Sequence, residues 1–434
     1  MKRLTRSVAA AAGIVLVAAA LTAAAPAAGG GGDDLSGESV EVAAVWTGAE
    51  QERFELVLEA FEDETGADVT FTSTGDDISA ALEPRISGGD PPDVAMLPQP
   101  GLLNDFVERG ALQSVEDAAG AAVDENYAPI WRELGSVDGT LYGVWFKAAN
   151  KSLVWYSTEV FSDAGVRPAD DFEGFMENAQ TISDFGVAPF SVGGANGWVL
   201  TDLFENIYLG QAGPDLYDQL SRHEIPWTDP SVTEALTTMA EVYSDDFLVG
   251  GVEGTLETEF PRSVQNVFAG DPEGAMVIEG DFVGGVITGE TDAKVGKQAK
   301  VAFFPAIEDA EAPVVTGGDV AVMFTNTEGG QALIEFLASP DAAEVWAEEG
   351  GYISPNQNVD SDAYPSKAQR RIADALVSAQ LIRFDLSDLQ PSEFGATDAQ
   401  GMWKLFQDFL ANPSDVNGIA QQLEDAAAQA YGSQ

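Results

Sequence analysis

Residues 87–97 read SGGDPPDVAML, and this stretch decides how the first part of the chain folds. Its two glycines favour the end of a helix, because glycine readily adopts the left-handed conformation that follows a last helical turn. Its two prolines prevent the helix from resuming, since proline has no backbone N–H to donate. The apolar residues 93–97 then form a short run bounded by prolines, which is typical of a buried strand.

The segments upstream alternate in the same way. Apolar runs predict strands at 40–45 and 67–71, and helical periodicity predicts helices at 50–64 and 76–87. Strand, helix, strand, helix, strand indicates a parallel α/β sheet with right-handed crossovers. Because ligands bind beyond the carboxyl ends of strands in such sheets, Pro98–Gly101 is a candidate binding loop.

The second half of the chain is richer in helical patterns. Asp229 and Ser339, each followed by proline, are typical residues at the start of a helix. The pattern predicts helices at 228–245, 339–351 and 415–431, and strands at 275–278, 300–304 and 319–324. The sequence therefore predicts two α/β lobes with several crossings between them.

The charge is strongly acidic. The 434 residues include 72 acidic and 20 basic side chains, for a net charge of −52. Such a surface repels phosphate backbones, so we expect no nucleic acid partner. Its simplest interpretation is a solvated acidic surface suited to salty or acidic surroundings.

No catalytic motif is present in the sequence. The one histidine, His223, has no G-x-S-x-G motif to accompany it, and neither G-x-G-x-x-G nor a P-loop occurs. Two carboxylates suffice for glycoside hydrolysis, but among 72 acidic residues such pairs carry no information. We therefore expect no enzyme activity, no cofactor and no metal.

The N-terminus has the form of a secretory signal. Residues 1–27 carry three basic residues, an apolar run and an A-x-A cleavage motif, followed by a glycine-rich linker at 28–39. A retained membrane anchor is the alternative. Cysteine is absent from the sequence, so disulfides and a lipid-modified N-terminal cysteine are excluded. We expect an exported protein, periplasmic or at the extracellular face of the membrane.

Six segments in order resemble the bacterial extracellular solute-binding proteins that serve carbohydrate ABC importers. They are ISGGDPPDVAMLPQPGLLNDFVERGALQSVED (86–117), LYGVWFKAANKSLVWYSTEVFSDAGV (141–166), GWVLTDLFENIYL (197–209), AMVIEGDFVGGVI (275–287), FFPAI with PVVTGGDVAVM (303–323), and FLASPDAAEVWAEEGGYISPN (336–356). Within that family the sequence is most similar to the α-glucoside binders.

The resemblance implies a type II periplasmic-binding-protein clamshell, an α/β fold with hinge crossings. The N-terminal lobe would comprise 40–149 plus 314–350, and the C-terminal lobe 150–313 plus 351–434. The protein would be a monomer that captures an α-glucoside or disaccharide between the lobes and delivers it to membrane permease subunits. A receptor for another solute, such as a polyol or amino sugar, and a secreted glycoside-active enzyme are the alternatives.

A sugar site needs flat aromatic rings and a few fixed polar groups. The strand ends, the lobe crossings and the resemblance together predict these ligand-binding residues: Trp46, Glu50, Gln51, Gln99, Trp145, Lys147, Asn150, Trp198, Asp202, Asp281, Phe282, Gly317, Gly318 and Asp319.

Several of these residues have structural alternatives. Trp46 is equally typical of a core, Glu50 of a helix N-terminus, Gln99 of an exposed turn, and Lys147 of an ion pair. Asp202 could belong to a helix cap with Glu205, and the glycines before Asp319 to a turn. Trp403 is expected to pack within a helix.

Overall fold

The computed structural model describes residues 34–75, 77–307, 314–378 and 382–432. The predicted signal peptide lies outside the described residues. Leu35, within the predicted linker, is buried and donates its backbone N–H to Thr65, so the ordered body begins before the first strand. In the part of the chain that the structure describes, no helix is both long and apolar enough to cross a membrane.

The larger sheet contains the predicted parallel core. β1 pairs in parallel with β2 and β3, and β11 pairs antiparallel with β3, giving the strand order β12-β11-β3-β1-β2 with β6 also on β11. The strands are β1 (Ser39–Ala44), β2 (Asp68–Ser73), β3 (Val94–Leu97), β6 (Gly143–Asn150), β11 (Val314–Met323) and β12 (Ile382–Phe384).

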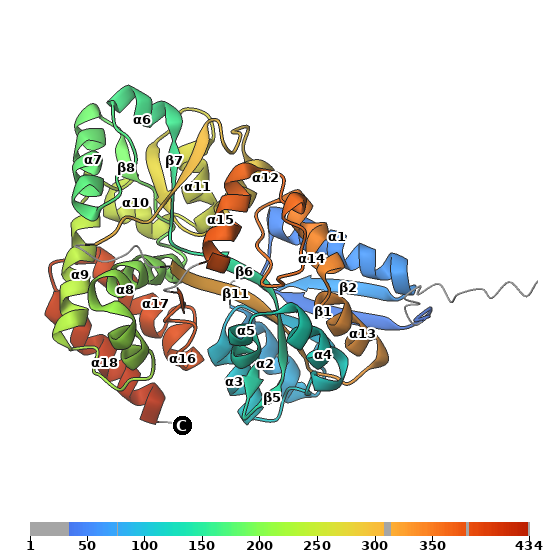
Figure 1. Cartoon of the computed structure of the whole chain (residues 1–434). Coiled ribbons are helices and arrows are strands. Elements are labelled where there is room, and N and C mark those ends of the chain that lie inside the picture. Colours follow the sequence, from blue (N-terminus) through green and yellow to red (C-terminus); the bar gives the residue numbers. More distant parts are fainter. Residues whose placement is uncertain (1–33, 76, 308–313, 379–381, 433–434) are drawn as a thin grey trace, which may run out of the picture. The chain divides into compact units, whose positions relative to one another are not determined.

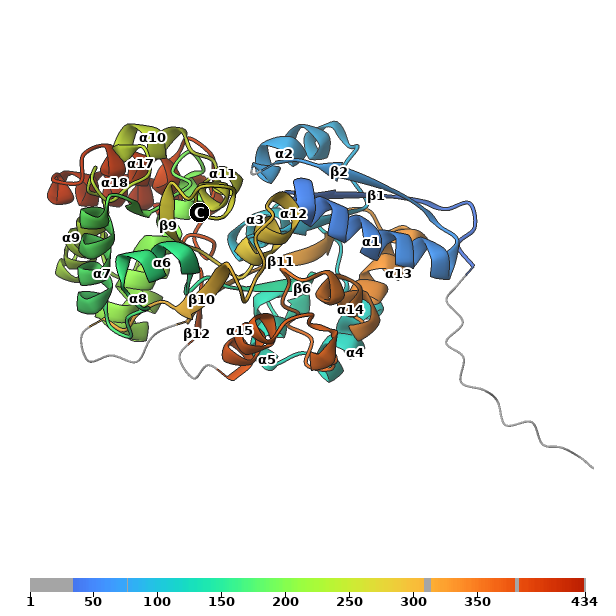
Figure 2. The same ribbon diagram turned by 90° about the horizontal axis from the view of Figure 1, so that it is seen from above.

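The first two helices begin and end within two residues of the predicted bounds. The residues that follow α1 and α2, Gly66 and Gly89, both adopt the left-handed conformation. Helix α3 begins at Pro100, however, so only the first half of the predicted loop is irregular. The helices packed around this sheet include α1 (Gly48–Thr65), α2 (Ile78–Gly88), α3 (Pro100–Glu108), α4 (Glu116–Asn126), α5 (Pro129–Leu134), α13 (Glu328–Leu337), α14 (Pro340–Glu349) and α15 (Lys367–Ser378) (Figures 1 and 2).

A second, smaller sheet has the order β10-β7-β9-β8. Its strands are β7 (Leu153–Ser157), β8 (Ala188–Phe190), β9 (Gly274–Ile278) and β10 (Ala299–Phe303). The remaining helices are α6 (Thr158–Ala164), α7 (Phe172–Phe185), α8 (Gly197–Ser221), α9 (Pro230–Val242), α10 (Gly251–Glu257), α11 (Phe260–Phe268), α12 (Val283–Glu290), α16 (Ser392–Gly395), α17 (Gly401–Ala411) and α18 (Val416–Gly432). A hairpin of β4 (Ser136–Val137) and β5 (Thr140–Leu141) and the short helix η1 (Ser361–Ala363) complete the elements.

The pair β6 and β11 connects the two groups of elements (Figure 1). β6 is fully buried and is followed almost directly by β7 of the smaller sheet, while β11 follows β10 along the chain. The pattern predicts β11 only from residue 319, but the strand begins five residues earlier, because Thr316 and Gly317 pair with Asn150 and Ala149. The lobe boundaries remain a prediction.

Candidate ligand-binding site

One cavity collects residues from many parts of the chain. Its wall is formed by Val45, Trp46, Glu50, Pro98, Gln99, Lys147, Ala149, Lys151, Trp198, Phe260, Phe282, Gly318, Asp319, Asp385, Ser387, Asp388 and Trp403. Trp46 and Gln99 follow strands β1 and β3 at their carboxyl ends, where ligands bind in open α/β sheets. Lys147 and Asp319 lie opposite each other on β6 and β11.

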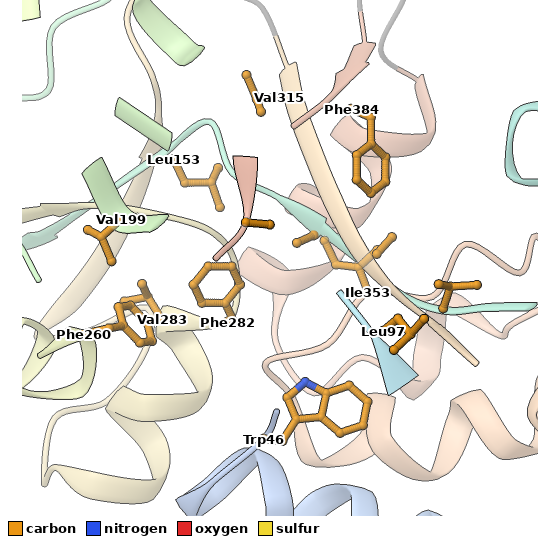
Figure 3. Packing of buried hydrophobic residues seen from close by; sticks show 14 of the residues in the cluster. Trp46, Leu97, Leu153, Val199, Phe260, Phe282, Val283, Val315, Ile353 and Phe384 are labelled. Atoms are coloured by element: carbon orange, nitrogen blue, oxygen red, sulfur yellow. The ribbon is translucent and has the colours of Figure 1, made fainter. Parts of the chain in front are cut away.

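Aromatic rings form one side of the cavity. Trp198 at the start of α8, Phe260 at the start of α11 and Phe282 before α12 contact one another, with ring centroids 5.3–6.0 Å apart. Figure 3 shows Phe260 beside Phe282, with Trp46 on a separate segment. Rings of this kind present flat apolar faces that match the C–H faces of a sugar.

Lys147 is surrounded by acids and rings. Its Nζ lies 2.5 Å from Glu50 and 3.9 Å from Asp319. The rings of Trp46 and Trp346 lie with their centroids 5.5 and 5.2 Å from the same atom. Burial alone would lower the pKa of Lys147, but the negative charges of Glu50 and Asp319 outweigh it and raise the pKa. Lys147 is therefore a charged group in the wall.

Lys151 stands in a different environment, among acids that are almost fully buried. Its Nζ lies 2.5 Å from Asp385 and 3.1 Å from Asp202, whose side chains are almost fully buried. Burial opposes ionisation of Asp385, yet Lys151 lowers the pKa of this carboxyl. The two charges therefore form a largely buried ion pair that joins the end of β6 to the segment after β12.

Glu205 fixes that segment. Its carboxylate accepts hydrogen bonds from the backbone N–H groups of Leu386 (2.8 Å) and Ser387 (3.0 Å). Asp202, Glu205 and Asp385 form an acidic cluster of the kind that can hold a metal ion. The ammonium of Lys151 supplies one positive charge beside two of these carboxylates, those of Asp202 and Asp385.

Eight of the fourteen predicted ligand-binding residues lie in the cavity wall: Trp46, Glu50, Gln99, Lys147, Trp198, Phe282, Gly318 and Asp319. The other six are not part of this wall: Gln51, Trp145, Asn150, Asp202, Asp281 and Gly317.

Trp145 is displaced by a β-bulge. Asp319 pairs with Lys147 and the next residue, Val320, pairs with Trp145, so Phe146 is the extra residue. A bulge reverses the alternation of side chains, and Trp145 packs against Trp131 and Phe384 instead of facing the cavity with Lys147.

The other five residues contact other parts of the protein and do not line the cavity. Gln51 points along α1 and bonds Glu55. Asp281 accepts the backbone N–H of Asn150 at 2.8 Å, and the side chains of both residues are buried. Asp202 pairs with Lys151 as described, and the predicted cap between Asp202 and Glu205 is wrong, because both lie inside α8. Gly317 makes room for Lys151, since a Cβ there would lie 2.8 Å from its Cε.

Sequence reasoning missed several wall residues, namely Lys151, Phe260, Asp385, Ser387, Asp388 and Trp403. Trp403 does pack within a helix, α17, as expected, and it also lines the cavity. The sequence did contain a reason to consider Lys151 as a site residue, because basic residues are scarce in this chain and Lys151 directly follows the predicted crossing. Nothing in the sequence around residues 385–388 points to a site.

A family model of the bacterial extracellular solute-binding proteins matches residues 47–344, and the chain belongs to this family. It is 34% identical over 398 residues to the osmoprotective compounds-binding protein GgtB of Synechocystis sp., covering 90% of this chain and 93% of that protein. It is 30% identical to the α-glucosides-binding periplasmic protein AglE of Rhizobium meliloti, covering 89% and 86%.

Solved structures agree on the fold. The bacterial solute receptor AcbH, described as having an exclusive preference for β-D-galactopyranose, superimposes with a TM-score of 0.81 at 17% identity, covering 91% of this chain and 99% of that one. The α/β periplasmic-binding-protein fold of type II is therefore confirmed, as is the assignment to the solute-binding proteins of ABC sugar transport.

The chain is a non-enzymatic, extracellular or periplasmic receptor component of an ABC transporter. His223 lies outside the cavity wall, and its Nε2 bonds Glu424 at 3.1 Å.

Proposed function

We propose that this receptor binds an α-glucoside, such as a disaccharide or a glucoside of a polyol, in the cavity and delivers it to the permease. The observation that carries the proposal is the combination of aromatic rings (Trp198, Phe260 and Phe282) with buried polar groups (Lys147 and Asp319) in one wall. Rings match the faces of a pyranose, and the polar groups match its hydroxyls.

The two relatives support the same class of ligand. One is named for osmoprotective compounds and the other for α-glucosides. Neutral sugars that act as osmoprotectants satisfy both descriptions, and the acidic surface of this chain suits a saline habitat in which such compounds are useful.

The proposal is tested by titrating the protein with sugars in high-salt buffer and following tryptophan fluorescence and heat. The panel contains maltose, trehalose, sucrose, palatinose and glucose, with sorbitol and glucosamine for a polyol or amino-sugar receptor. We expect saturable micromolar binding of one α-glucoside and no product after prolonged incubation. The absence of a fluorescence change and of binding heat for every α-glucoside would overturn the proposal.

A matched pair of variants shows where the sugar binds. Trp198→Phe replaces a fluorescent indole of the cavity wall with a phenyl ring and should abolish most of the fluorescence change, whereas Trp131→Phe, which changes a tryptophan outside the wall, should leave it intact. Equal responses of the two variants would place the ligand outside this cavity.

A further inference from the structure

We propose that Arg53 sets the affinity of this receptor for its solute, because its buried charge opposes the contact between α1 and α12 that closes one side of the cavity. Arg53 lies on α1, one turn after Glu50 of the cavity wall. Helix α12 begins directly after Phe282, which belongs to the same wall. The inference goes beyond the proposed function, since it applies to any solute that the cavity encloses.

Helices α1 and α12 join the two groups of elements beside the cavity. Helix α1 follows β1 of the larger sheet, α12 follows β9 of the smaller sheet, and the two helices contact each other (Figure 2). Glycines of α12 allow this close approach, because a Cβ at Gly289 would lie only 2.6 Å from the Cβ of Ala49. A Cβ at Gly285 would lie 2.7 Å from Nη1 of Arg53. Since both helices begin at the cavity wall, we expect this contact to separate when the cavity opens.

Arg53 is buried in this contact without a hydrogen-bonded carboxylate. The residue is 8% exposed, and its Nη2 donates to Oγ1 of Thr288 at 3.0 Å and to the carbonyl oxygen of Gly285 at 3.4 Å. Its Nη1 is buried and donates to no residue that the structure describes. Within the described ranges, both acceptors of the guanidinium are therefore neutral groups, and both belong to α12.

A charge in this environment favours separation of the two helices. An ionised side chain loses its hydration on burial, and hydrogen bonds to neutral acceptors restore only part of the lost free energy. Burial lowers the pKa of Arg53, and the negative charges of Glu50 and Glu349 offset this only in part, so the surroundings disfavour the charged form. When α12 moves away from α1, water replaces both acceptors. Arg53 therefore stabilises the open receptor relative to the closed one.

The cost of burying Arg53 lowers the affinity of the receptor. A solute enclosed by the cavity binds the closed form, and its apparent affinity falls in proportion to the population of that form. Weak closure also speeds dissociation, since a closed cavity has to open before the solute leaves. Removing the charge should therefore tighten binding, whereas removing an acceptor of the charge should weaken binding.

The test changes one group of the contact at a time and measures affinity by calorimetry with maltose, trehalose, sucrose and palatinose. Arg53→Met keeps an unbranched side chain but removes the charge, and should tighten binding about tenfold, mainly through slower dissociation. Thr288→Val removes one acceptor of the guanidinium and should weaken binding about fivefold. In the double variant, Thr288→Val should add nothing, because the donor is gone. Damage to the fold would instead weaken binding in both single variants.

Arg109→Met provides the control, since Arg109 pairs with Glu83 at the end of α3 and both side chains are exposed. It removes one positive charge away from the contact and should leave the affinity unchanged. Thr288 is exposed, so Thr288→Val should fold and decides the matter even if Arg53→Met does not fold. Unchanged or weaker binding by folded Arg53→Met, or unchanged or tighter binding by Thr288→Val, would overturn the inference.

A second measurement needs no solute. The chain has no cysteine, so spin labels attach only at introduced thiols, here Glu59→Cys on α1 and Asp292→Cys after α12, both at exposed positions. Arg53→Met should raise the population with the shorter distance between the labels at least about twofold, whereas Thr288→Val and Arg109→Met should not raise it. If no sugar binds but this shift occurs, the proposed function fails while the role of Arg53 stands. If the distances in Arg53→Met match those of wild type, the role of Arg53 is wrong.

Discussion

Lys147 and Lys151 lie four residues apart at one end of β6, and both belong to the cavity wall. Their partners differ. Glu50, the partner of Lys147, has a side chain that is 22% exposed, whereas Asp202 and Asp385, the partners of Lys151, are 2% and 1% exposed. The partners of the two lysines are therefore hydrated to different degrees, although the Lys147 side chain itself is the less exposed of the two, at 5% against 12% for Lys151.

This difference separates two roles. A buried charge whose partner is removed has no water to replace it, while a partner near the opening can be rehydrated. We infer that Lys151 mainly holds the end of β6, helix α8 and the segment after β12 together. Lys147 is better placed to exchange its contacts for those of a ligand, since Glu50 and Asp319 share the wall with it.

The largest expected effect is on folding. Lys151→Met leaves Asp202 and Asp385 buried and unpaired, and should lower the free energy of unfolding by about 3–5 kcal/mol. Lys147→Met should lower it by about 1–2 kcal/mol, because Glu50 can be rehydrated. Urea denaturation at neutral pH measures both.

Lys404→Met is the matched control, since Lys404 is half-exposed and pairs with Asp408 on the surface of α17. Its effect should stay within about 0.5 kcal/mol. If Lys147→Met and Lys151→Met lowered the free energy of unfolding equally, the distinction between the two lysines would be wrong.

The next effect is on the pH dependence of stability. Burial raises the pKa of Asp281, near Lys147, to about 7, so the folded protein holds this proton more tightly than the unfolded chain does. The contribution of this group to stability is therefore greatest below about pH 4 and is lost as the pH rises to about 7. Asp281→Asn has no carboxyl group to titrate at this position. Its free energy of unfolding should therefore rise relative to that of wild type by about 3 kcal/mol between pH 4 and pH 8.

Asp385, beside Lys151, should behave in the opposite way. Its pKa is lowered in the folded protein, so its carboxylate stabilises the fold above the unfolded pKa and loses this effect as the pH falls. Asp385→Asn should therefore cost stability at pH 8. Denaturation curves at several pH values test both variants, and parallel stability profiles for wild type and Asp281→Asn would contradict the assignment.

The smallest expected effect is the dependence of stability on salt concentration. A net charge of −52 should make the melting temperature climb between low salt and 1–2 M KCl, because the Debye length shrinks to about 3 Å. The acidic partners of Lys151 are almost fully buried, so the loss of unfolding free energy in Lys151→Met should change by less than about 1 kcal/mol over the same range. A flat melting profile would refute the relief of surface repulsion, and a salt-dependent loss in Lys151→Met would refute a largely buried ion pair.

Local rules predicted most of the elements. Alternating apolar runs gave the β1–β2–β3 sheet, and residues such as Gly66, Asp229 and Ser339 marked helix ends, because capping depends on only a few neighbouring residues. The strand ends also led to Trp46 and Gln99, since the position of a ligand in a parallel sheet follows from topology.

The rest of the site depends on contacts that no local pattern contains. One extra residue at Phe146 turns Trp145 away from the cavity, and alternation alone could not reveal it. Asp385 and Asp388 come from a segment more than 230 residues beyond Lys151, and their functional surroundings exist only after folding. With 72 acidic residues in the chain, no single carboxylate could be singled out.

The cavity wall runs in sequence from Val45 to Trp403, a span of 358 residues. At a synthesis rate of about 5–20 residues per second, about 20–70 s separate the translation of its first and last members. During that interval the nascent chain has no complete binding site, so a sugar inside the producing cell cannot stabilise it. The receptor becomes able to hold its cargo only after nearly all of the polypeptide has been made.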